Sequence, residues 1–428
     1  MKIYTPHTVK ALSAIFLFLS LLPMQAREYA PELGKETFLN VWNKVNTTFY
    51  EKTFNGVDWK SIKSTYAARV EKAKSNKELR LILNEMLDEL KLSHFGVSKN
   101  HQEPGNRVTT GTYLGMELRI VKQQLMVYDI VKGSPADRAG LKPGMILTSF
   151  EGEPMAEIIE SFELTSKSTP LRRMMAIRSI LTKISTPEDG KTTLKTANSE
   201  TVFDFKPSFY QGETGRLGHQ THIPFSFETR LVGKEKNIRF LAFDIFLPEL
   251  MPRINQALAQ AHSEKAAGLI LDLRGNPGGV GIMAPGIIGR IISKDLDLGD
   301  MNNTAGNLPF HAYPQKNAYL GPVAVLVDSF SASTSEICAA ALQEHQRARI
   351  FGRTTTGAVL PSVIVNLPNG DLLQYAVGDY VTALKKTHLE GKGVTPDQII
   401  PLDPSVFLTG TDPDLEAAML WLQKQPSK

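Results

Sequence analysis

The feature that most constrains this fold is a pair of short, nearly continuous apolar runs, residues 268–273 and 323–327, each followed by a turn of small residues. Apolar runs of this length are typical of strands buried on both faces of a sheet. A helical pattern precedes the first run, over residues 252–262, and another follows the second, over residues 332–344. Because strands and helices alternate, the sequence predicts an α/β core around a partly parallel sheet.

The first residues have the three parts of a secretory signal peptide. Lys2 and Lys10 supply a basic start, residues 11–22 are mostly apolar, and Met24-Gln25-Ala26 ends in a small residue suited to cleavage. An apolar run this short does not span a bilayer. We therefore expect cleavage after Ala26, export to the periplasm or the extracellular space, and no stable membrane insertion of the mature chain. The alternative is an uncleaved N-terminal anchor.

Between this segment and the core, the hydrophobic period changes. Apolar residues recur every three or four positions over residues 33–92, which indicates helices. Residues 111–208 mostly alternate between apolar and polar positions, with a helix expected over 171–184, and residues 209–236 are polar, as in a linker or lid. The predicted domains are a signal peptide (1–26), a helical N-terminal domain (27–107), a β-rich domain with two helices (108–208) and a core domain (209–428).

Composition narrows the classes of partner and cofactor. The formal net charge is +4 over 428 residues, and the charge is dispersed, so the sequence does not indicate nucleic-acid binding. Cys338 is the only cysteine, which excludes an intramolecular disulfide and leaves stability to a sizeable hydrophobic core. No clustered His/Cys spacing typical of a metal site is present, so neither a metal nor another cofactor is expected.

The second apolar run leads into the segment Asp328-Ser329-Phe330-Ser331-Ala332-Ser333, and a helical pattern follows. A strand, a turn of small residues and a helix together lift a hydroxyl to the carboxyl edge of the sheet, where the helix N-terminus presents free N–H groups. This is the geometry of a nucleophile elbow, here without its usual G-x-S-x-G signature. The alternative is a Ser/Thr-rich helix N-cap with no chemistry.

The first apolar run ends in the glycine-rich segment Asp272-Leu273-Arg274-Gly275-Asn276-Pro277-Gly278-Gly279. Unobstructed backbone N–H groups in such a turn suit an oxyanion hole. A phosphate cradle would need the same N–H groups, but the Walker-type Lys-Ser/Thr ending is missing. A tight strand-to-helix turn without any ligand is the remaining alternative.

Taken together, these two segments resemble the core of the C-terminal processing (tail-specific) serine peptidases. Asp272-Leu273-Arg274-x-Asn276-Pro277-Gly278-Gly279 is similar to their strand-turn signature, and Ser331-Ala332-Ser333-x-Ser335-Glu336-Ile337 to their nucleophile motif. The resemblance implies an α/β peptidase core of the ClpP/crotonase-like spiral type, behind a helical N-terminal segment and an inserted PDZ domain. It also implies that Ser333 is the nucleophile and that the N–H groups of Gly278 and Thr334 form the oxyanion hole.

The general base is expected to differ from that of many family members. They carry a lysine where this chain has Ala358, in the stretch Gly352–Ala358. Ser93-His94 and the segment around Glu390 resemble instead the tricorn core protease branch, which implies that His94 is the base and that Ser93 and Glu390 orient it. An imidazole with a near-neutral pKa suits this role, and would place the acidic limb of kcat/KM roughly between pH 6 and 7. Taken singly, a helix C-cap histidine and a solvated glutamate are the alternatives.

A further resemblance concerns the β-rich domain. Tyr113-Leu114-Gly115-Met116 is similar to the carboxylate-binding loop of PDZ domains, and residues 133–147 to their bacterial helix-strand signature. Such a domain captures a chain end by adding it as a strand and by holding its carboxylate on backbone N–H groups. The helix expected over 171–184 would form the other wall of the groove.

The function expected from these segments is that of an exported endopeptidase that binds unstructured or C-terminal polypeptide segments and cleaves them through an acyl-enzyme on Ser333. Polypeptides are the expected partners, and the mature protein is a possible homo-oligomer. One alternative is a catalytically inactive peptide-binding protein on the same scaffold, which the missing lysine motivates. The other is a ligand carrier, because retinoid-binding proteins of the eye resemble the same core.

Overall fold

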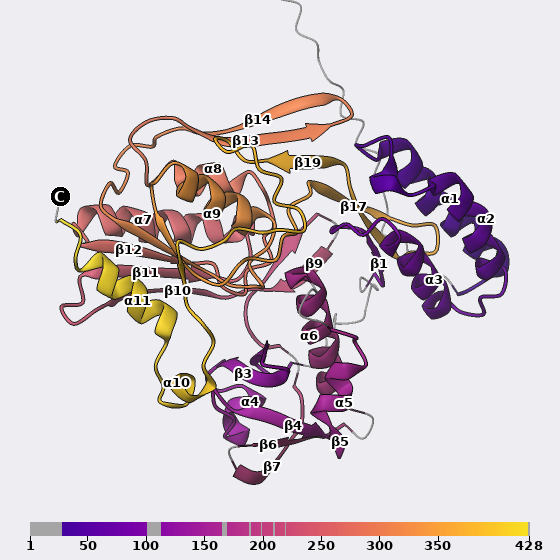
Figure 1. Ribbon diagram of the computed structural model, residues 1–428, viewed down its shortest axis with the longest axis horizontal. Coiled ribbons are helices and arrows are strands. Elements are labelled where there is room, and N and C mark those ends of the chain that lie inside the picture. The colour runs from indigo at the N-terminus through magenta and orange to yellow at the C-terminus, as the bar shows by residue number, and fades with distance from the viewer. Residues whose placement is uncertain are drawn as a thin grey trace, which may run out of the picture.

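The computed structural model describes residues 28–100, 113–164, 169–187, 190–197, 199–208, 210–218 and 220–426. The predicted signal peptide and the predicted boundary between residues 107 and 108 lie outside these ranges. Figure 1 shows a helical N-terminal segment, a β-rich inserted domain and a larger α/β core that ends in the C-terminal helix. The expected mixture of a helical start and an α/β core is thus confirmed, whereas the spiral topology stays a prediction.

The core is organised around a six-stranded sheet. All neighbouring pairs are parallel except the first, which is antiparallel. In spatial order its strands are β10 (Phe227–Val232), β11 (Ile238–Phe243), β12 (Gly268–Asp272), β15 (Val323–Val327), β16 (Arg349–Gly352) and β20 (Gln398–Ile399). Every residue of β12 and β15 is buried, as the two apolar runs predict. Their ends therefore bring the glycine-rich and serine-rich segments to one edge of the sheet.

Helices cover both faces of this sheet. Alternate strand residues such as Leu269 and Leu271 pack in one cluster with the helices that follow the strands, whereas Ile270 packs in another with the C-terminal helix. This division follows from the two-residue period of a strand. The helices are η2 (Pro248–Leu250), α7 (Met251–Ser263), α8 (Met283–Ile288) and α9 (Thr334–Glu344) on the first face, α11 (Pro413–Leu422) on the second, and α10 (Pro404–Leu408) before it.

Two smaller antiparallel sheets surround the core. One contains β14 (Gly306–Ala312), β13 (Leu296–Asn303) and β19 (Gly378–Val381), and the other contains β1 (Gly96–Ser98), β18 (Leu372–Ala376) and β17 (Ser362–Asn366). The pairing of β1 with β18 joins the N-terminal segment to the core. That segment consists of α1 (Pro31–Thr48), η1 (Phe54–Gly56), α2 (Trp59–Val70) and α3 (Asn76–Asp88).

The inserted domain, residues 113–208, is a twisted sheet with helices packed against it (Figure 1). Its sheet order is β2-β3-β4-β6-β7, so β2 is an edge strand, and β5 pairs with β4. Its elements are β2 (Met116–Val121), β3 (Gln124–Ile130), α4 (Pro135–Ala139), β4 (Ile146–Phe150), β5 (Glu153–Pro154), α5 (Met155–Glu160), α6 (Pro170–Ser185), β6 (Thr192–Thr196) and β7 (Ser199–Phe205).

The structure corrects the prediction for the polar stretch 209–236. Its described residues form a hairpin of β8 (Thr214–Leu217) and β9 (Gln220–Pro224), and then β10 of the main sheet. Because β10 is an edge strand whose exposure largely alternates, half of its side chains are polar, and its sequence looks like a linker. Outside the undescribed gaps, no helix of the structure combines the length and apolar character needed to cross a bilayer.

Candidate active site

Ser333 lies where the turn after β15 meets the first residue of α9. Its backbone has φ 54° and ψ −118°, in a left-handed region that a side chain rarely adopts. Residues 328–333, here called the nucleophile turn, therefore form a strained strand-turn-helix junction of the kind that the sequence predicts. Such strain persists only where surrounding contacts hold it, and it presents the side chain away from the helix axis.

The two serines that flank Ser333 in sequence are anchors of this turn. Ser331 Oγ donates to the carbonyl of Leu273 at 2.7 Å and accepts from Asp328 N–H at 2.9 Å. Ser335 Oγ donates to the carbonyl of Asn276 at 2.9 Å. Both hydroxyls are buried and fully used in holding the nucleophile turn against the glycine-rich turn, residues 274–279, which leaves them structural.

Glu336 organises the backbone around Ser333, a role that the sequence analysis does not assign. Its fully buried carboxylate accepts from the N–H groups of Ser333, Gly357 and Ala358 at 3.0, 2.7 and 2.9 Å, and from the Thr355 hydroxyl. Burial raises the pKa of the carboxyl to about 7, although the four donors favour its ionised form. A glutamate three residues after a nucleophile at a helix N-terminus is the signal that could have indicated this role.

The glycine-rich turn approaches Ser333 closely. Gly278 has φ 94°, and a Cβ atom there would lie 2.7 Å from Ser333 Cβ and 2.9 Å from Thr334 N, so only glycine fits. The position of Gly278 beside Ser333 and Thr334 agrees with the predicted oxyanion hole. In this structure, however, the Gly278 N–H donates to Asn276 Oδ1 at 2.9 Å, so an oxyanion would have to replace that contact.

The loop between α3 and β1 holds Ser93 between His94 and a carboxylate from the far end of the chain. Ser93 Oγ donates to Glu390 Oε2 at 2.9 Å and lies 2.7 Å from His94 Nδ1. Ser93 N–H also donates to Glu390 Oε1 at 2.7 Å, and Val359 N–H donates to Oε2 at 3.0 Å. These three predicted residues therefore form one hydrogen-bonded row, Glu390–Ser93–His94.

The row fixes which nitrogen of His94 can act as a base. The single hydroxyl proton of Ser93 is donated to Glu390, so Ser93 Oγ can only accept from His94 Nδ1–H. Nε2 then carries the free lone pair. Burial lowers the pKa of His94 from its ordinary 6.5 to about 4, and burial raises that of Glu390. The near-neutral pKa expected from sequence is therefore too high for His94.

The row is linked to the nucleophile through the segment after Gly357. Val359 donates to Glu390, and the carbonyl of its neighbour Ala358 accepts from Ser333 N–H at 2.8 Å. His94 and Ser333 both have left-handed backbones, with φ 61° and 54°. The nucleophile turn thus contacts this segment directly, whereas the loop that carries Ser93 and His94 is linked to it through Glu390.

Comparison with known proteins identifies two family models in this chain. Residues 239–400 match the family described as peptidase family S41, and residues 34–88 match the Tricorn protease C1 domain. This chain contains a peptidase family S41 domain. It is a serine-type peptidase, and the first of the two matches includes both the glycine-rich turn and the nucleophile turn.

Relatives of this S41 peptidase are found among sequences and solved structures. It is 24% identical to a carboxyl-terminal-processing protease of Synechocystis sp. over 89% of this chain and 84% of that protein. The photosystem II D1 C-terminal processing protease has a similar fold, with a TM-score of 0.57, 22% identity and coverage of 92% and 98%. The tricorn protease structure matches with a TM-score of 0.53 and 15% identity over 92% of this chain and 37% of that one.

In this S41 peptidase the position that resembles the family lysine lies directly against the nucleophile but carries no base. Ala358 is buried and exchanges backbone contacts with Ser333 and Glu336. The nearest lysines downstream of Ala358 are Lys385 and Lys386, and Lys386 Nζ is held at Asp300 at 3.1 Å with more than half of its side chain exposed. The histidine that the described contacts link to this segment, through Ser93 and Glu390, is His94.

The predicted carboxylate loop, residues 113–116, lies at the start of the edge strand β2. Gly115 has φ 72°, and a Cβ atom there would overlap Ser134. The N–H of Tyr113 already donates to the carbonyl of Ser208, so Leu114, Gly115 and Met116 supply the remaining candidate N–H donors. The loop is folded back on the start of α4, because the carbonyl of Leu114 accepts from Ala136 N–H at 3.0 Å.

Proposed function

We propose that this S41 peptidase is an exported endopeptidase that captures unstructured or C-terminal polypeptide segments and cleaves them through an acyl-enzyme on Ser333. The observation that carries the proposal is the Glu390–Ser93–His94 row, because it prepares a neutral imidazole with a free Nε2, and because its Glu390 accepts from Val359, the neighbour of the residue that holds Ser333 N–H. A row of this kind gives an enzyme without the family lysine a base that works near neutral pH.

In the proposed reaction, Ser333 Oγ attacks the carbonyl carbon of the scissile bond while His94 Nε2 takes the hydroxyl proton. The N–H groups of Gly278 and Thr334 bind the tetrahedral oxyanion, with Gly278 turning from Asn276 to the substrate. His94 then gives its proton to the leaving amine, and the peptide bond breaks. Water repeats the sequence on the ester, which releases the carboxylic acid and restores Ser333.

Glu390 acts in this scheme through Ser93. Its partly buried carboxylate keeps the Ser93 hydroxyl pointing away from His94, which holds the imidazole in the Nδ1–H tautomer. When His94 becomes an imidazolium during the reaction, the same carboxylate offsets its charge across the serine. In this row Ser93 lies between the carboxylate and the imidazole, whereas in an Asp-His pair the two are in direct contact. The resting imidazole is therefore less basic, in line with its low pKa.

The inserted domain is proposed to be a PDZ domain that presents substrate to the core. β2 has a free edge to which an extended peptide can add as a strand, and α6 packs across from it. The N–H groups of Leu114, Gly115 and Met116 would hold the terminal carboxylate. A peptide ending in an apolar residue should therefore bind more tightly than its C-terminal amide in titration calorimetry, and equal affinities would contradict carboxylate capture.

A serine-directed fluorophosphonate tests the catalytic part of the proposal. The full chain should be labelled at one site and should cleave an unstructured polypeptide, whereas the Ser333→Ala variant should do neither. Labelling of Ser333→Ala to the wild-type extent would place the nucleophile elsewhere. A chain that binds peptides but is neither labelled nor active would support the inactive-scaffold alternative, which the retained Ser333 and His94 disfavour.

Export is proposed from the sequence of the first 26 residues. N-terminal sequencing of the protein recovered outside the cytoplasm should begin at Arg27. Retention of Met1 in that fraction would instead support an uncleaved anchor.

A further inference from the structure

Asp328 lies where the two turns of the active site meet. It follows the last residue of β15, and its side chain is 1% exposed. Asp328 Oδ1 accepts from the N–H of Gly275, in the glycine-rich turn, at 2.9 Å. The same oxygen accepts from the N–H of Phe330, in the nucleophile turn, at 3.0 Å. One carboxylate oxygen therefore fixes the turn that carries Ser333 relative to the turn that carries Gly278.

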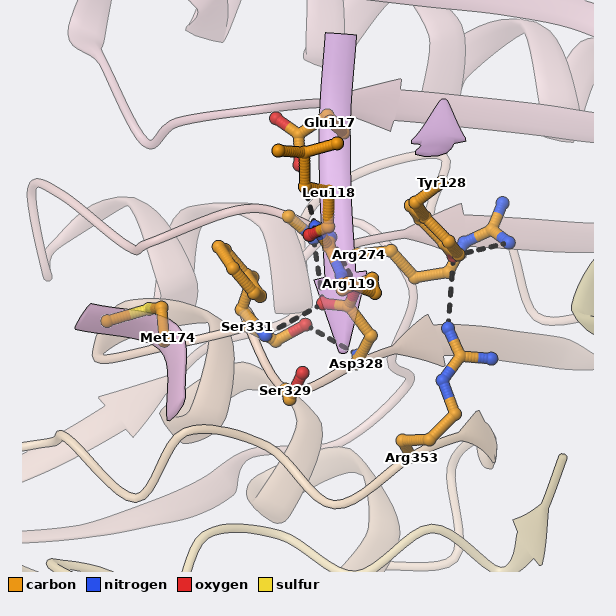
Figure 2. Close-up of polar contacts among 12 residues, drawn as sticks. Glu117, Leu118, Arg119, Tyr128, Met174, Arg274, Asp328, Ser329, Ser331 and Arg353 are labelled. Atoms are coloured by element: carbon orange, nitrogen blue, oxygen red, sulfur yellow. Dashed lines mark hydrogen bonds and ion pairs between the residues drawn. The ribbon is translucent and has the colours of Figure 1, made fainter. Parts of the chain in front are cut away.

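The other oxygen of Asp328 is held by the inserted domain. Arg119, on β2, donates to Asp328 Oδ2 from Nη2 at 2.6 Å and from Nε at 3.0 Å, as Figure 2 shows. Its side chain is 3% exposed. The rings of Phe330 and Tyr128 lie 3.8 and 4.4 Å from the guanidinium carbon. The guanidinium is thus fixed both by a charge-assisted pair of hydrogen bonds and by two aromatic rings.

The charge of Arg119 decides the state of Asp328. Burial alone would raise the pKa of this carboxyl, but Arg119, Arg353 and the backbone donors hold it at about 2. A buried carboxylate that loses its cation takes up a proton or draws in water. The proton would go to Oδ2, the oxygen that Arg119 leaves, and the neutral carboxyl would then accept more weakly at Oδ1 from the N–H groups of Gly275 and Phe330.

We propose that Arg119 is a positioning residue for the peptidase reaction, which the inserted domain supplies and which acts through Asp328 on both turns at once. The inference rests on the proposed role of Ser333 as nucleophile. The core by itself leaves Asp328 without this cation, so the cleavage site is complete only while the inserted domain is docked. Phe330 strengthens the link, because it lies in the nucleophile turn yet is buried in the hydrophobic cluster of the inserted domain.

A positioning role for Arg119 predicts a different change in the kinetic constants than a general contribution to the stability of the fold. If the two turns shift relative to each other, the Ser333 hydroxyl and the oxyanion donors no longer converge on one carbonyl, although a peptide can still add to β2. Misplacement of reacting groups by about 1 Å costs on the order of a hundredfold in rate. The loss should therefore fall on kcat and on the limiting rate of acylation, and not on KM.

The test uses the full-length chain and two substitutions of Arg119, with Tyr128→Phe as the matched control. Tyr128 belongs to the same interface, and its hydroxyl accepts from Arg274 Nη1 at 3.3 Å and from Arg353 Nη2 at 3.0 Å. Phenylalanine removes those bonds but keeps the ring over Arg119. For each variant we would measure the limiting rate of labelling by a fluorophosphonate, kcat and KM for an unstructured peptide, and folding by near-ultraviolet circular dichroism.

Arg119→Met should lower the limiting labelling rate and kcat by about a hundredfold, with KM changed by no more than about threefold. Arg119→Lys keeps the positive charge but not the paired donors of the guanidinium. Its labelling rate and kcat should therefore lie within about tenfold of wild type. Tyr128→Phe should be labelled at the wild-type rate. The double variant Arg119→Met, Asp328→Asn should be no slower than the slower single variant, because the pair acts as a unit.

Wild-type labelling rates in folded Arg119→Met or Arg119→Lys would overturn the inference, and so would an equal loss in Tyr128→Phe. If Arg119→Met does not fold, the comparison of Arg119→Lys with Tyr128→Phe decides. Failure of the proposed function would look different, because the wild-type chain itself would remain unlabelled or Ser333→Ala would be labelled like wild type.

Discussion

The N-terminal helices and the inserted domain both reach the active site, but they are joined to the core in different ways. The helices share a sheet with it through β1 and β18, and their hydrophobic cluster includes Leu373 and Tyr375 of the core. Among the described residues, the main cluster of the inserted domain takes only Phe330 from outside the domain, and a smaller cluster on its surface packs against Phe407 of α10. One region is therefore part of the core, whereas the other is a separate unit docked onto it.

This difference matches what each region is proposed to supply. The inseparable helices carry His94, which must meet Ser333 in every turnover. The separable domain carries Arg119, which needs only to hold Asp328, and it also carries the carboxylate loop that would receive substrate. A chain built in this way keeps its general base permanently in place but makes the alignment of its two active-site turns depend on a docked domain.

Removal of the base should have the largest effect. His94→Ala should lower kcat/KM by about a thousandfold or more, because the Ser333 hydroxyl loses the group that accepts its proton. His94 lies in the loop between α3 and β1, outside the helices and strands, so the variant should remain folded. Lys386→Ala is the matched control, since Lys386 is exposed and paired with Asp300, and it should keep full activity. A dead but folded Lys386→Ala would point to a relocated Ser–Lys pair.

Substitution of one buried leucine in each region tests the difference in packing. Leu83 in α3 and Leu125 in β3 are both 0% exposed, so replacing either by alanine should cost about 2–5 kcal/mol. In calorimetry Leu83→Ala should lower the main unfolding transition, because its cluster is shared with the core. Leu125→Ala should instead bring forward a separate transition of the inserted domain, and labelling of Ser333 should be lost with it. A single shared transition in both variants would contradict the separation.

Much of the core could be predicted from sequence because its signals are local. The apolar run at 323–327 corresponds to β15 residue for residue, and the helix expected over 171–184 is α6, longer by one residue at each end. Strand β13, Leu296–Asn303, was not predicted, since its polar residues lie mostly at partly buried positions and interrupt the apolar pattern. A strand with this many polar residues gives the same pattern as a loop until its partners are known.

The contacts that align the active site could not be predicted, because they join distant parts of the chain. Nothing near Arg119 in the sequence indicates that it pairs with Asp328, and nothing near Asn276 indicates that its side chain accepts from Gly278. The Glu390–Ser93–His94 row could be proposed only from a resemblance. A buried ion pair leaves no periodic trace in the sequence, whereas a strand or a helix does.

Weakening of the row should have a smaller effect than removal of the base. Glu390→Gln keeps the shape of the side chain but removes its charge, so Ser93 can turn its hydroxyl toward His94 and the imidazole loses its fixed tautomer. We expect kcat to fall by about a hundredfold with little change in KM. Ser93→Ala should lower kcat to a similar extent, and the double variant should be no worse than either. Strict additivity of the two losses would show that the residues act separately.

The smallest expected effect is on activity in mild acid, where the buried base should stay functional. Because burial lowers the pKa of His94 to about 4, the imidazole stays neutral well below pH 6.5. Protonation of His94 should therefore change kcat/KM by less than about twofold between pH 7.5 and 5.5. Stability should respond to the same group. As pH falls from 6.5 toward 4, the unfolded chain takes up a proton at His94 that the folded chain does not, so the free energy of unfolding should decrease.

Glu336 should act on stability in the opposite direction. Its pKa is raised to about 7, so as pH falls from 7 toward 4.5 the folded chain takes up the proton first, and the free energy of unfolding should increase. Denaturant titrations of His94→Ala and Glu336→Gln against wild type, each across this pH range, separate the two contributions because their signs differ. If kcat/KM of the wild-type chain has an acidic limb near pH 7, protonation of Glu336 disturbs the nucleophile turn before His94 titrates. A limb near pH 4 would assign it to the imidazole that the N-terminal helices hold in place.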